Sequence, residues 1–210
     1  MFSITSHSRR KMKETEHYYT KTPTSRLKFK KVEFVWNSRR FKFITPSGVF
    51  SYGGIDKGSR ILLENAIVKP GWKLLDLGCG YGFIGICLAA SYPLDVLMAD
   101  INSRAVSFTR KNIKLNNVGN AEVIQSDLFD KISGKYDTII SNPPTHAGRE
   151  VCFKLIIDSI HFLKKRGLLQ IVARHNKGGK VLMDKMKEVF GNVETSAIQS
   201  GYRVYYSVKN

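Results

Sequence analysis

A short stretch around Gly80 combines one carboxylate with a glycine-rich turn. The apolar run Leu74–Leu77 contains one acid, Asp76, and is followed by glycines at alternate positions, Gly78, Gly80 and Gly82. Glycine lets the backbone turn sharply and brings its N–H groups close to a ligand. The spacing from Gly80 to Gly85 fits the G-x-G-x-x-G pattern of dinucleotide sites. On its own, this turn is equally compatible with a strand-to-helix connection that binds nothing.

Polar side chains recur where later apolar runs end. We expect strands over residues 95–101, 121–125 and 136–141, which end at Asp100, at Ser126-Asp127 and at Asn142-Pro143-Pro144. In an open parallel sheet such ends meet at one edge, where ligands bind. Asp100 lies about 20 residues beyond the glycine turn, where such folds place an acid for a ribose diol. Together with Asp76, these strand ends predict one binding site.

The remaining elements predict an α/β fold. After the glycine turn we expect a helix to Ala90, and then helices and strands in alternation. The other helices are expected over 59–68, 103–115, 150–165 and 179–190, and the later strands over 167–173, 193–199 and 203–208. Ser200-Gly201-Tyr202 joins the last two strands tightly, so the final strand runs antiparallel to its partner. This order favours a twisted, mostly parallel sheet with helices on both faces.

Residues 26–45 predict a basic β-hairpin ahead of the sheet. Aromatic and apolar residues alternate with cations, and Asn37-Ser38 is typical of a hairpin turn. Cations such as Arg39 and Arg40 could bind phosphates while the rings stack on bases. Alternatively, the aromatics face inward and cover one edge of the core. We favour packing for the aromatics and nucleic-acid contacts for some cations. We expect a basic extension over 1–47 and a main domain over 48–210.

The net charge of +17 is unevenly distributed. Residues 1–47 carry +9 and residues 146–210 carry +7, whereas residues 71–145 are neutral. The expected binding edge is therefore neutral, and both ends of the chain are basic. A polyanion lying across the molecule is the simplest partner, with RNA or DNA first. The alternative is a solvated surface with a generally high lysine content.

Composition excludes several classes of protein. No run approaches the ~20 apolar residues that a membrane span needs, and the polar N-terminus lacks the apolar centre of a signal peptide. The three cysteines, Cys79, Cys87 and Cys152, are odd in number and show no C-x-x-C spacing. This argues against a disulfide framework or a zinc site and for a reducing, cytoplasmic location. We expect all three to be small apolar packing residues.

Several motifs in combination resemble a known family. The stretch from Asp76 to Gly82, the acids Asp100 and Asp127, and the corner Asn142-Pro143-Pro144 resemble class I S-adenosylmethionine-dependent methyltransferases of the Asn-Pro-Pro type. The loop 46–51 and the segment 56–59 are similar to the catalytic domain of small-subunit rRNA guanine-N2 methyltransferases, and closer still to the short archaeal members. The resemblance covers roughly Pro46 to the C-terminus. It implies a Rossmann-like sheet of seven strands and an RNA substrate, either rRNA or a ribosomal subunit.

The resemblance also implies a cofactor site for S-adenosyl-L-methionine. Asp76 would hold the glycine turn and the amino end of the cofactor, Asp100 would accept the ribose hydroxyls, and Asp127 would accept from the adenine amino group. The alternatives are that Asp76 and Asp127 cap helices and that Asp100 is a solvated strand end. The complete cofactor set would be Phe50, Ser51, Asp56, Asp76, Gly78, Cys79, Gly80, Tyr81, Gly82, Asp100, Ile101, Ser126, Asp127 and Asn142.

The catalytic residues by the same resemblance are Asn142, Pro143 and Pro144. The exocyclic amine of a base is a poor nucleophile because its lone pair is delocalised into the ring. The Asn142 side-chain oxygen and the Pro143 carbonyl would accept hydrogen bonds from the two N–H groups of the amine. These bonds would localise and orient the nitrogen lone pair. Proline has no N–H to compete and a fixed φ. Methyl transfer then needs alignment and charge neutralisation rather than a strong base.

One position departs from the family pattern. An aromatic residue that stacks on the target base usually follows the second proline, but here it is Thr145, then His146. The ring could come from Phe50, Tyr52, Tyr81 or His146. The expected substrate contacts are Phe50, Arg39, Arg40, Thr145 and His146. Two other functions stay open: methylation of a protein glutamine amide, which the same Asn-Pro-Pro device performs, and RNA binding without turnover.

Overall fold

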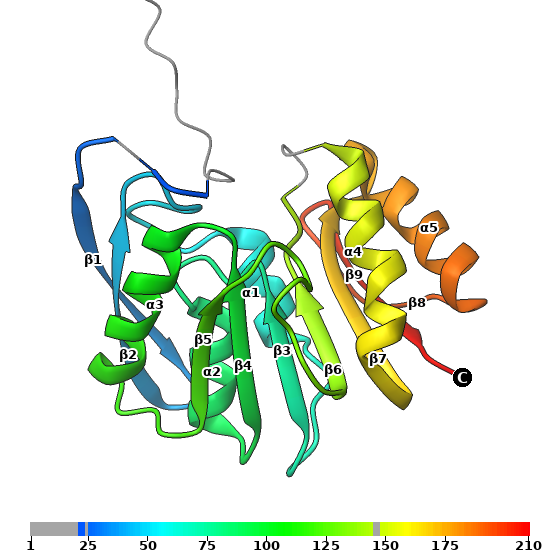
Figure 1. Ribbon diagram of the computed structural model, residues 1–210, viewed down its shortest axis with the longest axis horizontal. Helices are drawn as coiled ribbons and strands as arrows, with labels where there is room; N and C mark the ends of the chain where they lie inside the picture. Colours follow the sequence, from blue (N-terminus) through cyan, green and yellow to red (C-terminus); the bar gives the residue numbers. More distant parts are fainter. Residues whose placement is uncertain (1–20, 24, 145–147) are drawn as a thin grey trace, which may run out of the picture.

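The computed structural model describes residues 21–23, 25–144 and 148–210. Its main sheet has seven strands in the order β5-β4-β3-β6-β7-β9-β8 (Figure 1). The strands are β3 (Lys73–Leu77), β4 (Asp95–Asp100), β5 (Ala121–Gln125), β6 (Tyr136–Ser141), β7 (Leu163–Arg174), β8 (Glu194–Gln199) and β9 (Tyr202–Val208). Only β9 runs antiparallel to its neighbours, β7 and β8. The predicted α/β class, with its mostly parallel seven-stranded sheet and closing hairpin, is confirmed.

Helices cover both faces of this sheet. They are α1 (Lys57–Glu64), α2 (Phe83–Ser91), α3 (Ser103–Leu115), α4 (Arg149–Phe162) and α5 (Lys180–Phe190), with a π-helical turn, η2 (His175–Gly179), before α5. Successive residues of β3 point to opposite faces, so Leu74 joins the core under α1 and α2 while Leu75 joins the core under α4 and α5. Burial on both faces explains the continuous apolar run of this strand.

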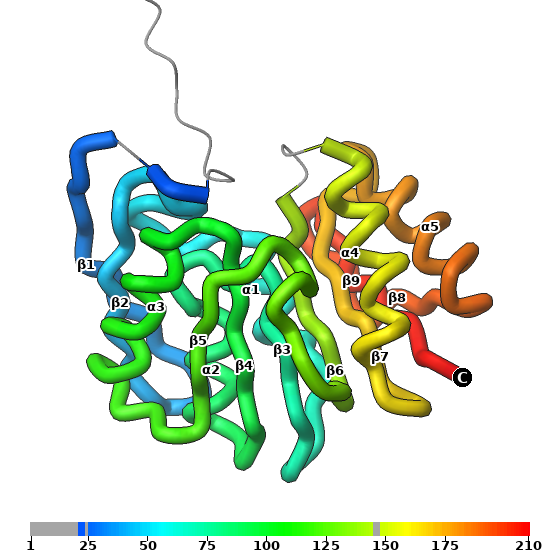
Figure 2. Tube along the Cα trace, viewed as in Figure 1, coloured from blue at the N-terminus to red at the C-terminus, as the bar shows by residue number. Residues whose placement is uncertain are grey.

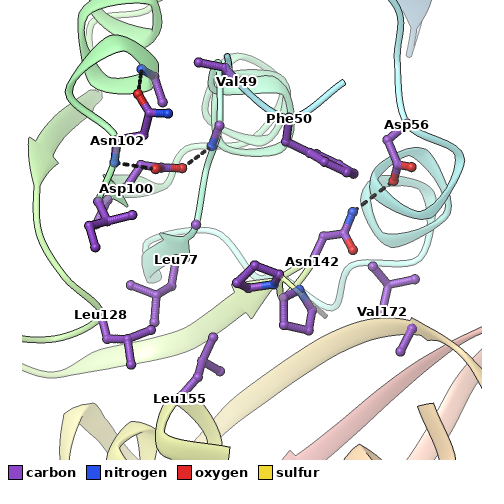
Figure 3. Close-up of a pocket in the computed structure, with 18 of the residues that line it drawn as sticks. Val49, Phe50, Asp56, Leu77, Asp100, Asn102, Leu128, Asn142, Leu155 and Val172 are labelled. Carbon is purple, nitrogen blue, oxygen red and sulfur yellow. Dashed lines mark hydrogen bonds between the residues drawn. The ribbon is translucent and has the colours of Figure 1, made fainter. Parts of the chain in front are cut away.

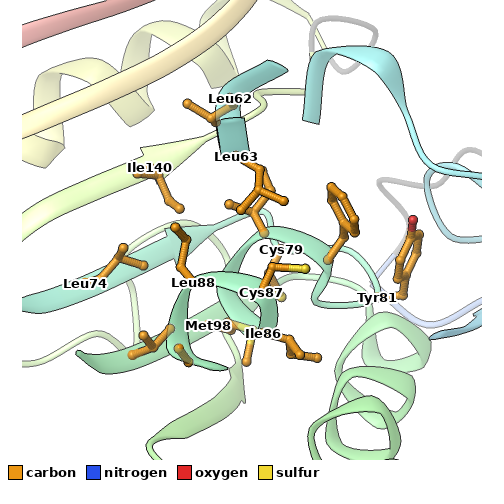
Figure 4. Packing of buried hydrophobic residues seen from close by; sticks show 14 of the residues in the cluster. Leu62, Leu63, Leu74, Cys79, Tyr81, Ile86, Cys87, Leu88, Met98 and Ile140 are labelled. Carbon is orange, nitrogen blue, oxygen red and sulfur yellow. The ribbon is translucent and has the colours of Figure 1, made fainter. Parts of the chain in front are cut away.

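The buried cysteines belong to these two cores, as predicted. Cys79 and Cys87 pack with Leu62, Leu63 and Met98 in the first core (Figure 4), and Cys152 lies in the second. Each fully buried leucine of such a core contributes about 1.5–3 kcal/mol relative to exposure. No helix in the described part of the chain is long and apolar enough to cross a bilayer.

The predicted N-terminal hairpin forms β1 (Phe29–Trp36) and β2 (Arg39–Pro46), and it lies beside α3 (Figure 2). Two buried asparagines bind the edge of β2. Asn112 in α3 exchanges hydrogen bonds with both backbone groups of Ile44, and Asn116, the C-cap of α3, does the same with Lys42. Four helical residues advance about 6 Å and two strand residues about 6.7 Å, so the two pairs stay in register. Phe41 and Phe43 are fully buried, which confirms packing for these aromatics.

Two predicted helices extend too far at their C-terminal ends. The helix expected to reach residue 68 ends at Glu64, because Gln170 of β7 binds both backbone groups of Ile67 and holds that segment out of the helix. The helix expected over 150–165 ends at Phe162, and β7 begins at once at Leu163, where it pairs with Tyr136. In both cases a partner distant in sequence overrides the local pattern.

Candidate active site

A cavity of about 500 Å³ opens at the carboxyl edge of the parallel strands. The ends of β3, β4 and β6 contribute Leu77, Asp100 and Asn142, while Phe50 and Asp56 come from the loop before α1 (Figure 3). Of the residues expected from the sequence, those that line the cavity are Phe50, Asp56, Gly78, Gly80, Asp100, Ile101, Ser126, Asn142, Pro143 and Pro144. Asp100, Ser126 and Asn142, which follow or end three predicted strands, therefore share one cavity.

The glycine turn and Asp100 form one hydrogen-bonded unit. Gly80 N–H donates to Asp100 Oδ2 at 2.8 Å, and Asn102 N–H donates to Oδ1 at 2.9 Å. Gly78 has a φ of +77° and a Cβ built there meets nothing within 4 Å, so the backbone faces open space at this point. Burial raises the pKa of Asp100 to about 6, against the opposing effect of the two N–H donors. Asp100 is therefore mostly ionised at neutral pH, with both oxygens fixed in direction.

Asp76 lies beneath the turn and does not line the cavity. Its Oδ2 accepts the N–H of Gly85 at 2.9 Å in the first turn of α2, and the residue is 1% exposed. Burial raises the pKa of Asp76 to about 7; the Gly85 donor opposes this rise and the nearby Asp100 charge adds to it. Asp76 therefore fixes the start of α2, directly after the glycine turn.

Four other residues of the expected cofactor set also support the site without lining the cavity. Tyr81 and Ser51 both donate to the carbonyl of Gly54, at 2.9 and 3.1 Å, and so fix the loop that carries Phe50. Cys79 lies in the apolar core, and Gly82 precedes α2 with a φ of +88°. A Cβ at Gly82 would lie 2.7 Å from Thr109, so this position has no room for a side chain. Their direct contact with a cofactor stays a prediction.

Asp127 is exposed at the end of β5 and lies outside the cavity lining. Its neighbour Ser126 does line the cavity, and Ser126 Oγ donates to the carbonyl of Leu128 and accepts from the N–H of Lys131. The structure thus supports Ser126 as a rigid corner of the site. A contact between Asp127 and an adenine stays a prediction.

The Asn142 side chain is held by two partners from the start of α1. Its Nδ2 donates to Asp56 Oδ2 and to Ser59 Oγ, both at 2.9 Å. Asp56 Oδ2 also accepts the N–H of Ser59 at 2.8 Å, which makes Asp56 the N-cap of α1. Both amide hydrogens are thereby occupied, so Asn142 Oδ1 is the atom left to accept a hydrogen bond in the cavity. Figure 3 shows the amide nitrogen turned towards Asp56.

The expected substrate contacts divide into separate groups. Arg39 and Arg40 lie at the opposite end of the hairpin from the cavity: Arg39 donates to the carbonyls of Ala90 and Asn116, and Arg40 pairs with Glu33 at 2.7 Å. Phe50 lines the cavity, whereas Tyr81 is buried. Thr145 and His146 fall outside the described residues.

Two cations and an aromatic residue are among the cavity residues that were not predicted from the sequence. Arg174, Lys177 and Tyr202 line the side built from β7, η2 and β9. The guanidinium carbon of Arg174 lies 4.9 Å from the centroid of the Tyr202 ring. The signal was present for Arg174, because it directly follows the fifth predicted strand, 167–173, at the same sheet edge. Ser59 was also missed as a partner of Asn142.

A protein-family model described as "Methyltransferase small domain" matches residues 40–206. The uncharacterized protein YbxB of Bacillus subtilis is 34% identical over 93% of this chain and 99% of its own length. The ribosomal RNA small subunit methyltransferase C of Cronobacter sakazakii is 36% identical over 78% of this chain, and the match spans 48% of that relative. The chain thus spans about half the length of the named methyltransferases that it matches.

A solved structure shares the fold. The Thermus thermophilus 16S rRNA N2-guanine methyltransferase, determined in complex with AdoMet and guanosine, superposes with a TM-score of 0.76 at 23% identity, over 90% of this chain and 52% of that one. A methyltransferase from Pyrococcus furiosus gives a TM-score of 0.64 at 20% identity, over 72% of this chain and 82% of that one.

Proposed function

The chain belongs to the methyltransferase small domain family, and from this premise we propose that it is an S-adenosyl-L-methionine-dependent methyltransferase acting on RNA. Its most favoured target is the N2 amino group of a guanine in ribosomal RNA, free or in a ribosomal subunit. Similarity to ribosomal RNA small subunit methyltransferases supports this target, and so does the net charge of +17. We therefore propose a cytoplasmic location for the protein.

The chemistry of the cavity fits the proposed cofactor. An ionised acid with both oxygens held by backbone donors, Asp100, suits a pair of ribose hydroxyls. The open space at Gly78 lets a ligand approach the backbone itself. A cavity of about 500 Å³ lies within the range of sites for small molecules and cofactors. When bound, S-adenosyl-L-methionine supplies an electrophilic methyl group on a sulfonium.

The residues of the chain orient the amine that receives the methyl group. Asn142 Oδ1 accepts one N–H of the target amine, because Asp56 and Ser59 occupy the hydrogens of its own Nδ2. The carbonyl of Pro143 accepts the other N–H, and neither Pro143 nor Pro144 has an N–H of its own to compete. Two acceptors localise the nitrogen lone pair and aim it, so the rate comes from alignment and electrostatics.

The fixed amide of Asn142 in the same cavity as Asp100 is the observation that carries this proposal. To test it, ribosomal RNA lacking the modification is incubated with the protein and methyl-labelled cofactor, then digested to nucleosides. We expect label in N2-methylguanosine. Label in a nuclease-resistant protein band would instead select a glutamine amide as the target. RNA binding with no label in either fraction would reject enzymatic methylation.

A further inference from the structure

Two cations and one aromatic ring form a wall of the cavity that the methyl-transfer chemistry does not use. This basic wall consists of Arg174 at the end of β7, Lys177 in η2 and Tyr202 at the start of β9. All three line the cavity that contains Asn142. The wall therefore lies on the same cavity as the proposed base-binding corner.

The wall is held in place by packing. The Arg174 guanidinium lies over the Tyr202 ring at 4.9 Å, a cation–π distance. The ring also rests against the start of α1: a Cβ built on Gly58 would lie 2.9 Å from Tyr202 Cε1 and 3.1 Å from Asp56 Oδ2. The ring thus contacts the helix that positions Asn142, and Arg174 loses little further freedom when it binds an anion.

The two cations of the basic wall are exposed and have no acidic partner within residues 25–144 and 148–210. Other exposed cations, such as Arg40 and Lys154, do pair with acids, at 2.7 Å in both cases. An exposed guanidinium and an ammonium beside a cavity attract an anionic group of the ligand.

We propose that the basic wall binds the phosphodiester next to the target base, with Arg174 and Lys177 on the phosphate oxygens and Tyr202 as the platform for Arg174. The proposal rests on the RNA substrate proposed above. A base that enters the cavity leaves its backbone at the rim, and phosphate contacts there position the nucleotide without reading its sequence. RNA is favoured over an acidic peptide because the wall lines the same cavity as Asn142, which is proposed to bind the amine of a base.

The test measures the affinity for a labelled single-stranded oligoribonucleotide with one guanine, by fluorescence anisotropy over a range of salt concentrations. Arg174→Ala and Lys177→Ala are each expected to weaken binding several-fold and to reduce the slope of log K against log salt by about 0.7. Tyr202→Leu weakens binding like Arg174→Ala, whereas Tyr202→Phe keeps the ring and the affinity. The matched control is Lys165→Ala, at the opposite end of β7, with an unchanged slope. Far-ultraviolet circular dichroism shows that each variant is folded. A loss of cofactor affinity in Arg174→Ala or Lys177→Ala with an unchanged slope for RNA would assign the wall to the cofactor and overturn the proposal.

Unchanged slopes in Arg174→Ala and Lys177→Ala would overturn the proposal, even when the wild-type protein methylates RNA. Reduced slopes in a protein that methylates no RNA would support the basic wall and reject the proposed reaction. Polyglutamate serves as the competing acidic peptide. The proposal fails if polyglutamate displaces the RNA from the wild-type protein and both variants bind polyglutamate more weakly but RNA equally well. The wall would then bind an acidic peptide.

Discussion

Asn142 Nδ2 lies 2.9 Å from Asp56 Oδ2, so an acid from the loop before α1 fixes an amide at the end of β6. The same oxygen of Asp56 caps α1 through the N–H of Ser59. Helix position and amide orientation are therefore coupled through one carboxylate. This relationship makes Asp56 a positioning residue for the proposed reaction.

Asp56→Ala is expected to lower kcat by about tenfold or more, because the Asn142 amide loses an anchor and can rotate. It also removes a helix cap, at a cost of about 1 kcal/mol of folding free energy. Asp56→Asn keeps an oxygen that can accept both hydrogen bonds and is expected to restore most of kcat. Steady-state kinetics with calorimetry of the cofactor separates the effects. A weaker cofactor affinity with unchanged kcat would assign Asp56 to cofactor binding instead.

Cofactor affinity is expected to depend on the ionisation of Asp100. Its carboxylate must be ionised to accept from two hydroxyls, and its pKa is raised to about 6 by burial. Affinity is therefore constant well above pH 6 and falls by up to about tenfold per pH unit below it. Titration calorimetry from pH 8 to pH 5 measures this trend. Asp100→Asn should bind more weakly and lose the dependence below pH 6; a pH-dependent Asp100→Asn variant would contradict the assignment.

Asp76 is expected to make folding stability decrease as the pH rises. Its pKa in the folded protein is about 7, above the unfolded value of 3.8, so its contribution is fully present below about pH 4 and is lost as the pH rises through 7. Asp76→Asn stays neutral and keeps an acceptor for Gly85. Chemical unfolding measures the free energy of unfolding at both pH values. From pH 4 to pH 8, that of the wild-type protein should fall by roughly 4 kcal/mol relative to this variant. A difference that does not change with pH would show that Asp76 titrates normally.

Gly85→Ala tests the packing beneath the glycine turn. A Cβ at Gly85 would lie 2.6 Å from two atoms of Met98 and 3.1 Å from Asp76 Oδ2. Overpacking of this kind costs about 1–3 kcal/mol. Gly119→Ala is the control, since a Cβ there meets nothing within 4 Å. Urea unfolding of the two variants measures the costs; equal stability would show that the core accommodates the extra methyl group.

Most of the sheet could be predicted from the sequence because its strands are short apolar runs bounded by turns. The strands over 121–125 and 136–141 were predicted with the bounds that the structure shows. Where prediction failed, the deciding contact came from far along the chain. Gln170 lies 103 residues from Ile67, whose backbone it binds, and no local sequence pattern predicts that contact.

The candidate site, too, could be predicted from the sequence only in part. Asp100 and Asn142 were found because residues at the carboxyl ends of parallel strands must converge. The fixed orientation of Asn142 was not predictable, since Asp56 and Ser59 lie more than 80 residues earlier and reach it only through folding. The support roles of Asp76 and Tyr81 were also not predictable. Both belong to the motif, but Asp76 binds the backbone of Gly85 in α2 and Tyr81 binds the backbone of Gly54 in the loop before α1.

The most direct measurement is a single-turnover rate of methyl transfer to ribosomal RNA for wild type and Asn142→Ala, at saturating cofactor. Asn142→Ala is expected to lose about a hundredfold or more in rate, and a further increase in the cofactor concentration is not expected to restore it. An equal rate in the two proteins would contradict the claim that Asn142 Oδ1 orients the target amine.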